Sequence, residues 1–243
     1  AITPADFALS GQDARGATVS SAGELLTRFG YTVRYFKGAE PAQRALSDML
    51  DRNPAGLGID IETAPIPAFR LDQKAGLDPH KATIRLVQIA DQTKVLVFDL
   101  LHIPAAILSP AMDRKLIAHN AGFEYRFLYQ AGLVPVKLHC SLLMARLATG
   151  KPQGLGLAEC SKNALGIEVD KTLQVSAWHN PELSQAQIEY AALDAVLALK
   201  LSSIYLPMIR AMQQTDAYKR LVRALPVVSR QMLIGVPFDA ANH

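Results

Sequence analysis

The sequence contains little cysteine and no long hydrophobic run. Cys140 and Cys160 are the two cysteines among its 243 residues, and they do not form a C-x-x-C pair. This spacing argues against a zinc site and favours a reducing, cytoplasmic setting. Proline, glycine or a charged residue interrupts every apolar stretch before the roughly 18 residues that a membrane span requires. We therefore expect no transmembrane helix, no signal peptide and no membrane partner.

Charge is also sparse. Charged residues make up 19% of the chain, and the formal net charge is +3. This balance is compatible with a nucleic-acid partner but does not require one. Half of the residues are hydrophobic, which predicts a globular protein with one substantial core. The chain begins at Ala1 rather than methionine, so we expect a processed form or a fragment of a longer protein.

The order of apolar patterns predicts an α/β fold. Asp91-Gln92-Thr93-Lys94 is typical of a hairpin turn between two antiparallel strands. Later strands alternate with helices, which indicates a mixed sheet with helices on its faces. The expected strands cover residues 57–62, 84–90, 95–99, 116–118 and 138–140, with an edge strand at 31–37. The expected helices cover residues 20–28, 40–51, 120–132, 141–148, 157–165, 184–204 and 208–234.

Two acids stand one residue apart in the apolar segment Leu57-Gly58-Ile59-Asp60-Ile61-Glu62. Residues two apart in a strand share a face, so Asp60 and Glu62 would present neighbouring carboxylates at the strand's end. Such close like charges raise each other's pKa unless a cation lies between them. Taken alone, this pattern is more typical of a strand that ends in solvated acids. Further acids downstream favour a metal site.

A third acid, Glu124, follows His119 and Asn120 at a predicted strand-to-helix turn. The helix macrodipole favours an anion in the first turn, so Glu124 also has a purely structural explanation. We expect Asn120 to cap this helix. Both His119 and Asn120 are candidates to contact a substrate. The alternative for His119 is a hydrogen-bonded structural role.

The fourth acid lies in the best-defined predicted helix, which begins with the capping box Ser184-x-x-Gln187. Tyr190 and Asp194 are four residues apart on it and therefore share a face. The residues around Asp194 are apolar, so a buried carboxylate there would need a partner or a metal. A surface Tyr–Asp pair is the alternative.

Asp60, Glu62, Glu124 and Asp194 thus place four acids on three elements. Oxygen ligands favour Mg²⁺ or Mn²⁺ over Zn²⁺, and we expect two divalent ions as cofactors. Two such ions roughly 3.5–4 Å apart stabilise the attacking and leaving oxygens of a phosphoryl displacement. Tyr190 is expected to orient the attacking water through its hydroxyl group.

The ordered motifs Asp-x-Glu, Asn-x-x-x-acid and Tyr-x-x-x-Asp resemble those of the DEDDy 3′–5′ exonucleases. That group includes the proofreading domains of A-family DNA polymerases and ribonuclease D. Segments 84–90 and 171–184 are similar as well. The resemblance implies an RNase H-like fold whose five-stranded mixed sheet is antiparallel in its first three strands, then parallel, and flanked by helices. It also implies that Asp60, Glu62 and Asp194 bind one metal, with Asp60 bridging to the second.

The resemblance further implies a function and a domain order. Residues 31–206 would form a metal-dependent exonuclease domain that hydrolyses the 3′ end of single-stranded DNA to nucleoside monophosphates in proofreading, replication or repair. Residues 207–243 resemble the start of an A-family polymerase of phage or plasmid type, which leaves room for a covalently linked polymerase. Residues 1–30 would be an extension of unassigned role. The alternatives are a ribonuclease D-like exoribonuclease acting on RNA and a non-catalytic nucleic-acid-binding module.

One site residue departs from the family pattern. The second motif usually carries Asp where this chain has Glu124, and that acid mostly holds the second metal through water. We expect the extra methylene to preserve activity, with a weakened second site as the alternative. Ile66 falls where related exonucleases place an apolar wedge against the terminal bases. Phe123 is a further candidate substrate contact, with a core position as its alternative.

Several basic side chains are candidates for contacts with backbone phosphates, although each alone is more often a solvated charge. They are Arg70, Lys74, Lys81, Arg85, Arg126 and Lys171.

Overall fold

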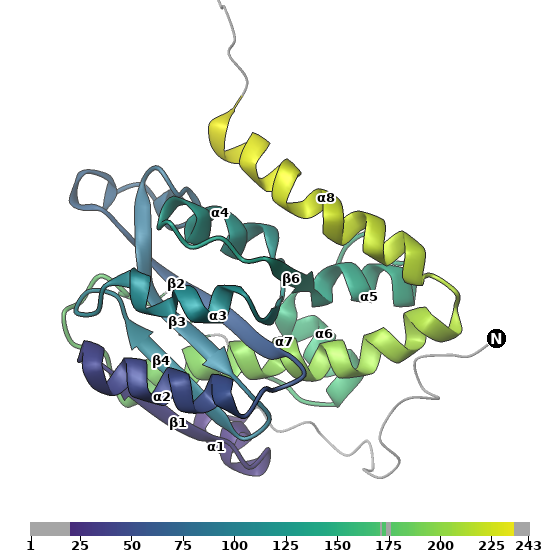
Figure 1. Cartoon of the computed structure of the whole chain (residues 1–243), viewed down its shortest axis with the longest axis horizontal. Helices are drawn as coiled ribbons and strands as arrows, with labels where there is room; N and C mark the ends of the chain where they lie inside the picture. Colours follow the sequence, from purple (N-terminus) through teal and green to yellow (C-terminus); the bar gives the residue numbers. More distant parts are fainter. Residues whose placement is uncertain (1–19, 171, 174–175, 236–243) are drawn as a thin grey trace, which may run out of the picture.

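The computed structural model describes residues 20–170, 172–173 and 176–235 (Figure 1). Its strands are β1 (Thr32–Phe36), β2 (Leu57–Pro65), β3 (Ala82–Ala90), β4 (Lys94–Asp99), β5 (Lys115–Ala118) and β6 (Lys137–Cys140). Its α-helices are α1 (Ala22–Arg28), α2 (Ala39–Asp51), α3 (Ser109–Met112), α4 (Gly122–Gln130), α5 (Ser141–Thr149), α6 (Leu157–Leu165), α7 (Gln185–Ala211) and α8 (Thr215–Ile234). The expected mixed α/β architecture is confirmed.

All the strands belong to one sheet with the order β1-β4-β3-β2-β5-β6. Strands β2, β3 and β4 are antiparallel neighbours, whereas β5 and β6 run parallel to β2. The five strands implied by the resemblance are therefore present, but the sheet has six. The additional strand is the predicted edge strand β1, which pairs in parallel with β4.

The first central strand is longer than its apolar pattern indicates. Strand β2 continues through Thr63 and Ala64 to Pro65, so Asp60 and Glu62 lie inside the strand rather than at its end. That expectation was wrong because pairing with β3 continues on the far side of a bulge. At the bulge Glu62 pairs with Leu86 and Thr63 with Ile84, which leaves Arg85 as the extra residue.

Helix ends follow the local signals in the sequence. The capping box at Ser184 and Gln187 opens α7, and Gly166 ends α6 in a left-handed conformation with φ of 67°. The expected cap by Asn120 was wrong, because α4 has Ala121 as its N-cap residue and no side-chain cap bond. Asn120 itself is left-handed with φ of 69°, and its carbonyl accepts a hydrogen bond from Phe123.

The helices cover both faces of the sheet (Figure 1). Helices α2, α3 and α4 share one hydrophobic cluster with the odd-numbered residues of β2, including Ile59 and Ile61. Helices α1 and α7 pack on the opposite face, in a cluster with Leu86, Ala90 and Val97 of the sheet. The far half of α7 packs against α5 and α6 in a third cluster. The central helix α7 therefore supports most of one face.

Helix α7 is long and apolar enough to span a membrane, because its most apolar 18-residue segment has a mean hydropathy of 1.5. However, 61% of that segment is buried inside the protein, as expected for the core helix of a folded domain. The helix continues through Pro207 to Ala211, so the expected division between residues 206 and 207 falls within it. Helix α8 packs back onto the domain through Tyr218 and Leu225. The domain division remains a prediction.

Candidate active site

A glycine on β2 lets α7 lie unusually close to the sheet. A Cβ atom on Gly58 would lie 2.1 Å from the carbonyl oxygen of Ala195 and 3.3 Å from the Cβ of Leu199. No larger residue fits there without moving the helix backbone. Asp60 follows Gly58 by two residues on the same face, and Asp194 precedes Ala195 on the helix. The close contact therefore brings these two carboxylates together.

Three of the four predicted acids converge. One carboxylate oxygen each from Asp60, Glu62 and Asp194 lies within 4.8 Å of the other two. All three residues are partly buried. This spacing is short enough for a single cation to contact all three carboxylates. The acids from the first and third sequence motifs therefore form one cluster, as expected.

Glu124 lies at the edge of this cluster. It is 3% exposed in the first turn of α4, and its Oε2 atom is buried with no hydrogen-bond partner in the part of the chain that the structure describes. Its charge interacts with those of Asp60 and Asp194. An orphaned buried carboxylate oxygen beside three other acids requires a cation or a proton.

Burial and mutual repulsion both stabilise protons on these acids. Burial raises the pKa of Asp194 to about 7, although a hydrogen bond from Tyr190 opposes the shift. Burial raises the pKa of Glu124 to about 8, with repulsion from Asp194 adding to it and Arg126 opposing it. The pKa of Asp60 is raised well above its usual range by burial and by its three acidic neighbours. The pKa of Glu62 is raised by burial and by Asp194.

Such a set of carboxylates fits divalent cations. The ligands are hard oxygen atoms without cysteine or histidine, which is the donor chemistry that Mg²⁺ and Mn²⁺ prefer. The shifted pKa values mean that metal binding would displace protons. Asp60, Glu62 and Asp194 are the residues that could hold such an ion, with Glu124 beside them.

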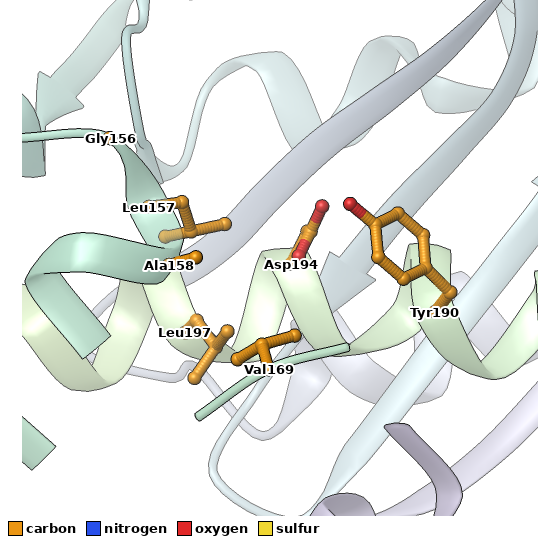
Figure 2. A pocket seen from close by; sticks show the side chains of 7 residues that line it. All are labelled: Gly156, Leu157, Ala158, Val169, Tyr190, Asp194 and Leu197. Atoms are coloured by element: carbon orange, nitrogen blue, oxygen red, sulfur yellow. The ribbon is translucent and has the colours of Figure 1, made fainter. Parts of the chain in front are cut away.

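Tyr190 points its hydroxyl group toward the carboxylate of Asp194, as Figure 2 shows. Burial, together with the charges of Asp194, Glu62 and Asp60, raises the pKa of Tyr190 far above its usual value. The hydroxyl therefore stays protonated at neutral pH. It can donate a hydrogen bond to Asp194 or to a water molecule, but it is not a base.

A small cavity of about 120 Å³ opens beside Asp194 and Tyr190 (Figure 2). Its other walls are the start of α6 and apolar side chains. These residues are Gly156, Leu157, Ala158, Val169 and Leu197. The cavity thus combines an acidic side with an apolar side.

The four predicted substrate contacts have different environments. His119 is buried, and its Nδ1 and Nε2 atoms lie 2.9 Å from the Oγ of Ser141 and from the carbonyl oxygen of Leu155. Both ring nitrogens are thus occupied, which matches the structural alternative. Asn120 is exposed, and Ile66 is half-buried. Phe123 is half-buried and packs against Phe127, with ring centroids 5.0 Å apart. Substrate contact by any of them remains a prediction.

Arg85 is not free to contact a phosphate, so that expectation was wrong. Its side chain is 3% exposed, and its five N–H donors bond to Asp99 and to three backbone carbonyls. Lys81 bonds to Asp72 at 2.7 Å. Lys171 lies outside the described residues. The remaining basic candidates stay predictions.

Two residues near the acids were not singled out by sequence reasoning. Gly58 interrupts an apolar strand, a position that often marks close approach of another backbone. Gln88 is a polar residue within the apolar run of β3 and lies opposite Asp60 in the sheet. Both signals were visible in the sequence, but the strand register was needed to interpret them.

Comparisons with known proteins agree with this geometry. Residues 57–210 match the model of a 3′–5′ exonuclease family, a span that includes all four acids and Tyr190. The chain is 32% identical to DNA polymerase I of Aquifex aeolicus over 120 residues, covering 49% of this chain and 21% of that protein. It is 28% identical to ribonuclease D of Gluconacetobacter diazotrophicus over 150 residues, covering 59% of this chain and 37% of that protein. The chain therefore spans well under half the length of either relative.

A solved structure with a similar fold is Brucella melitensis NrnC bound to pGG. The two share 26% identity with a TM-score of 0.68, and the match covers 84% of this chain and 95% of that one. The family match includes most of the sheet and α7, where the acids converge. This chain therefore belongs to the RNase H-like 3′–5′ exonuclease family, whose members are phosphodiester hydrolases.

Proposed function

We propose that this protein is a metal-dependent nuclease that removes nucleoside monophosphates from single-stranded 3′ ends. The observation that carries the proposal is the convergence of carboxylate oxygens from Asp60, Glu62 and Asp194 within 4.8 Å of one another. The two strand acids and the helix acid come from distant parts of the chain. Burying these carboxylates without cations is costly, so their convergence serves ion binding rather than stability.

The residues of the site would have different roles in the reaction. Asp60, Glu62, Asp194 and Glu124 would hold two Mg²⁺ or Mn²⁺ ions, which supply a more acidic water and neutralise charge on the phosphoryl oxygens. Tyr190 keeps its proton and donates a hydrogen bond that orients the attacking water. The cavity beside Asp194 would hold part of the terminal nucleotide against Leu157, Val169 and Leu197. Ile66 would separate the last bases.

We propose single-stranded DNA as the first candidate substrate. The relationship to DNA polymerase I of Aquifex aeolicus supports it. A covalently linked polymerase domain and a role in proofreading, replication or repair belong to the same proposal. The cysteines Cys140 and Cys160 are free and buried, which supports a cytoplasmic location.

A second candidate is RNA or a short oligonucleotide. The relationship to ribonuclease D favours it. NrnC of Brucella melitensis also favours it, because that protein has been solved bound to pGG. A site that contacts the 2′-hydroxyl group would discriminate between the two sugars.

An end-labelling assay tests the proposal. DNA and RNA oligonucleotides of equal sequence, labelled at the 5′ or the 3′ end, are incubated with Mg²⁺, Mn²⁺ or EDTA. We expect a 5′-labelled ladder, immediate release of a labelled monophosphate from the 3′-labelled strand, and no cleavage in EDTA. Asp60→Ala should abolish cleavage while the circular dichroism spectrum is unchanged. Persistent cleavage by Asp60→Ala would refute the site, and the ratio of DNA to RNA rates decides the substrate.

A further inference from the structure

Gln88 presents an unexplained buried amide beside the acidic cluster. The residue is 0% exposed in the middle of β3. Neither its Oε1 nor its Nε2 atom has a hydrogen-bond partner among the residues that the structure describes. An unsatisfied buried amide costs roughly 1–3 kcal/mol in folding free energy. Leucine or methionine at this position would avoid that cost, so the amide calls for a functional explanation.

The strand register places this amide next to a metal ligand. Gln88 pairs directly with Asp60 across the antiparallel β2–β3 ladder. Directly opposed side chains lie on one face with their Cβ atoms about 4.5–5.5 Å apart. Gln88 therefore points toward the same face of the sheet as Asp60. A glutamine side chain is long enough to reach the Asp60 carboxylate from there.

The other neighbours of Gln88 on this face cannot satisfy it. Leu86 and Ala90 flank it on β3, and Val97 lies opposite it on β4. All three belong to the apolar cluster beneath α7. Among these strand neighbours, Asp60 is the one with a polar side chain. The burial of Gln88 also keeps it from contacting a substrate.

We propose that Gln88 is a positioning residue for the metal site. When divalent ions bind, its Nε2–H group, which has no partner among the described residues, turns to donate a hydrogen bond to the Asp60 carboxylate and holds that side chain in the orientation that binds the ions. Outer hydrogen bonds of this kind fix ligand orientation and are typically worth 10- to 100-fold in metal affinity. The inference rests on the proposed function, because it assigns Asp60 to the metal site.

Metal binding without substrate provides the test. Gln88→Met keeps the length and volume of the side chain but removes the amide. The control is Ile89→Met, which lies on the same strand, faces the opposite cluster and is equally buried. Isothermal titration with Mn²⁺ should show about 10- to 100-fold weaker binding for Gln88→Met and unchanged binding for Ile89→Met. If Gln88→Met does not fold, Gln88→Leu takes its place.

Thermal unfolding in EDTA provides a second readout that general packing damage would move in the opposite direction. Removing an unsatisfied amide should leave the Tm of Gln88→Met equal to or above that of the wild type. Unchanged Mn²⁺ affinity, or weaker binding together with a lower Tm in EDTA, would overturn the proposal. Asp60→Asn is titrated in parallel. If Asp60→Asn loses Mn²⁺ binding while Gln88→Met retains it, only this inference fails; if both retain it, the proposed function fails as well.

Discussion

Arg85 and Asp99 form a salt bridge in the interior of the protein, with 2.8 Å between Nε and Oδ1 and side chains that are 3% and 0% exposed. A second donor of Arg85, on Nη2, bonds to Oδ2 of Asp99, and the other donors bond to the carbonyls of Trp178, Asn180 and Pro181. Burial alone would raise the pKa of Asp99, but Arg85 and Tyr35 hold that pKa below its usual range. The pair therefore links residues 178–181, which precede α7, to the sheet.

We predict that Arg85→Leu lowers the free energy of unfolding by about 3–5 kcal/mol, because it leaves Asp99 buried without its partner. The double variant Arg85→Leu/Asp99→Leu should lose much less than the sum of the single variants. Urea denaturation measures both. Arg44→Leu removes an exposed salt bridge to Glu40 and should change stability by no more than about 1 kcal/mol. Equal losses of unfolding free energy for Arg44→Leu and Arg85→Leu would contradict a stabilising role for the buried Arg85–Asp99 pair.

Gly58 is expected to be sensitive to substitution, because α7 lies directly against it. Gly58→Ala places a Cβ atom 2.1 Å from the backbone oxygen of Ala195, so α7 must move. Overpacking of this kind costs typically about 1–3 kcal/mol, and an ångström-scale shift of Asp194 could lower the rate by about 100-fold. Gly76→Ala is the matched control, because its Cβ would meet its nearest neighbour at an ordinary 3.4 Å. Wild-type turnover by Gly58→Ala would show that the close contact is dispensable.

Local signals in the sequence predict the helix ends, but they do not predict that α7 lies against Gly58. The bounds of α6 and the start of α7 follow from a terminal glycine and a capping box, which are signals within a few residues. The short helix α3 and the neighbouring 3-10 turn at Ala105–Leu108 were not anticipated, because elements of about one turn show no periodicity.

The candidate site also has features that local sequence patterns predict and features that depend on long-range pairing. Strand periodicity predicted that Asp60 and Glu62 share a face, and helix periodicity predicted the same for Tyr190 and Asp194. That Asp194 joins the two strand acids followed from the resemblance to the exonuclease family. The roles of Arg85 and Gln88 depend on partners far away in the sequence and on a bulge between β2 and β3. Such long-range register cannot be derived from local patterns.

Tyr190→Phe should slow the reaction without abolishing it. The hydroxyl group keeps its proton, because its burial and the charges around it raise its pKa, so the variant loses one hydrogen bond and no base. We expect kcat to fall roughly 10- to 100-fold, which corresponds to about 1.4–2.7 kcal/mol of activation free energy. Single-turnover kinetics on a labelled oligonucleotide measure this change. Tyr205→Phe on the same helix, buried away from the acids, is the control; an unchanged rate for Tyr190→Phe would remove Tyr190 from the mechanism.

Glu124→Asp should be close to neutral or should increase turnover. The resemblance implies Asp at this position and a contact to the second ion through water, which would tolerate a change of one methylene. We expect rates within about threefold of the wild type at saturating Mg²⁺. This is a small change in the activation barrier, because each 1.4 kcal/mol corresponds to a roughly tenfold effect on the rate. Glu124→Gln removes the charge and should raise the Mg²⁺ concentration needed for half-maximal rate. Complete loss of activity in Glu124→Asp would instead show that the longer side chain is specifically required.

His119 should make stability depend on pH in the acidic range. Burial lowers the pKa of His119 to about 4, against an unfolded value near 6.5, while the hydrogen bond to Leu155 opposes the shift. Between these values the unfolded chain binds a proton that the folded protein does not, so the free energy of unfolding falls as pH decreases from about 6.5 to 4. His119→Gln cannot titrate, so its stability deficit relative to the wild type should shrink by up to roughly 3 kcal/mol across that window. Urea denaturation in EDTA measures both proteins, and the exposed His179→Gln is the control. Parallel stability curves for wild type and His119→Gln would show that His119 does not stay neutral in the folded state.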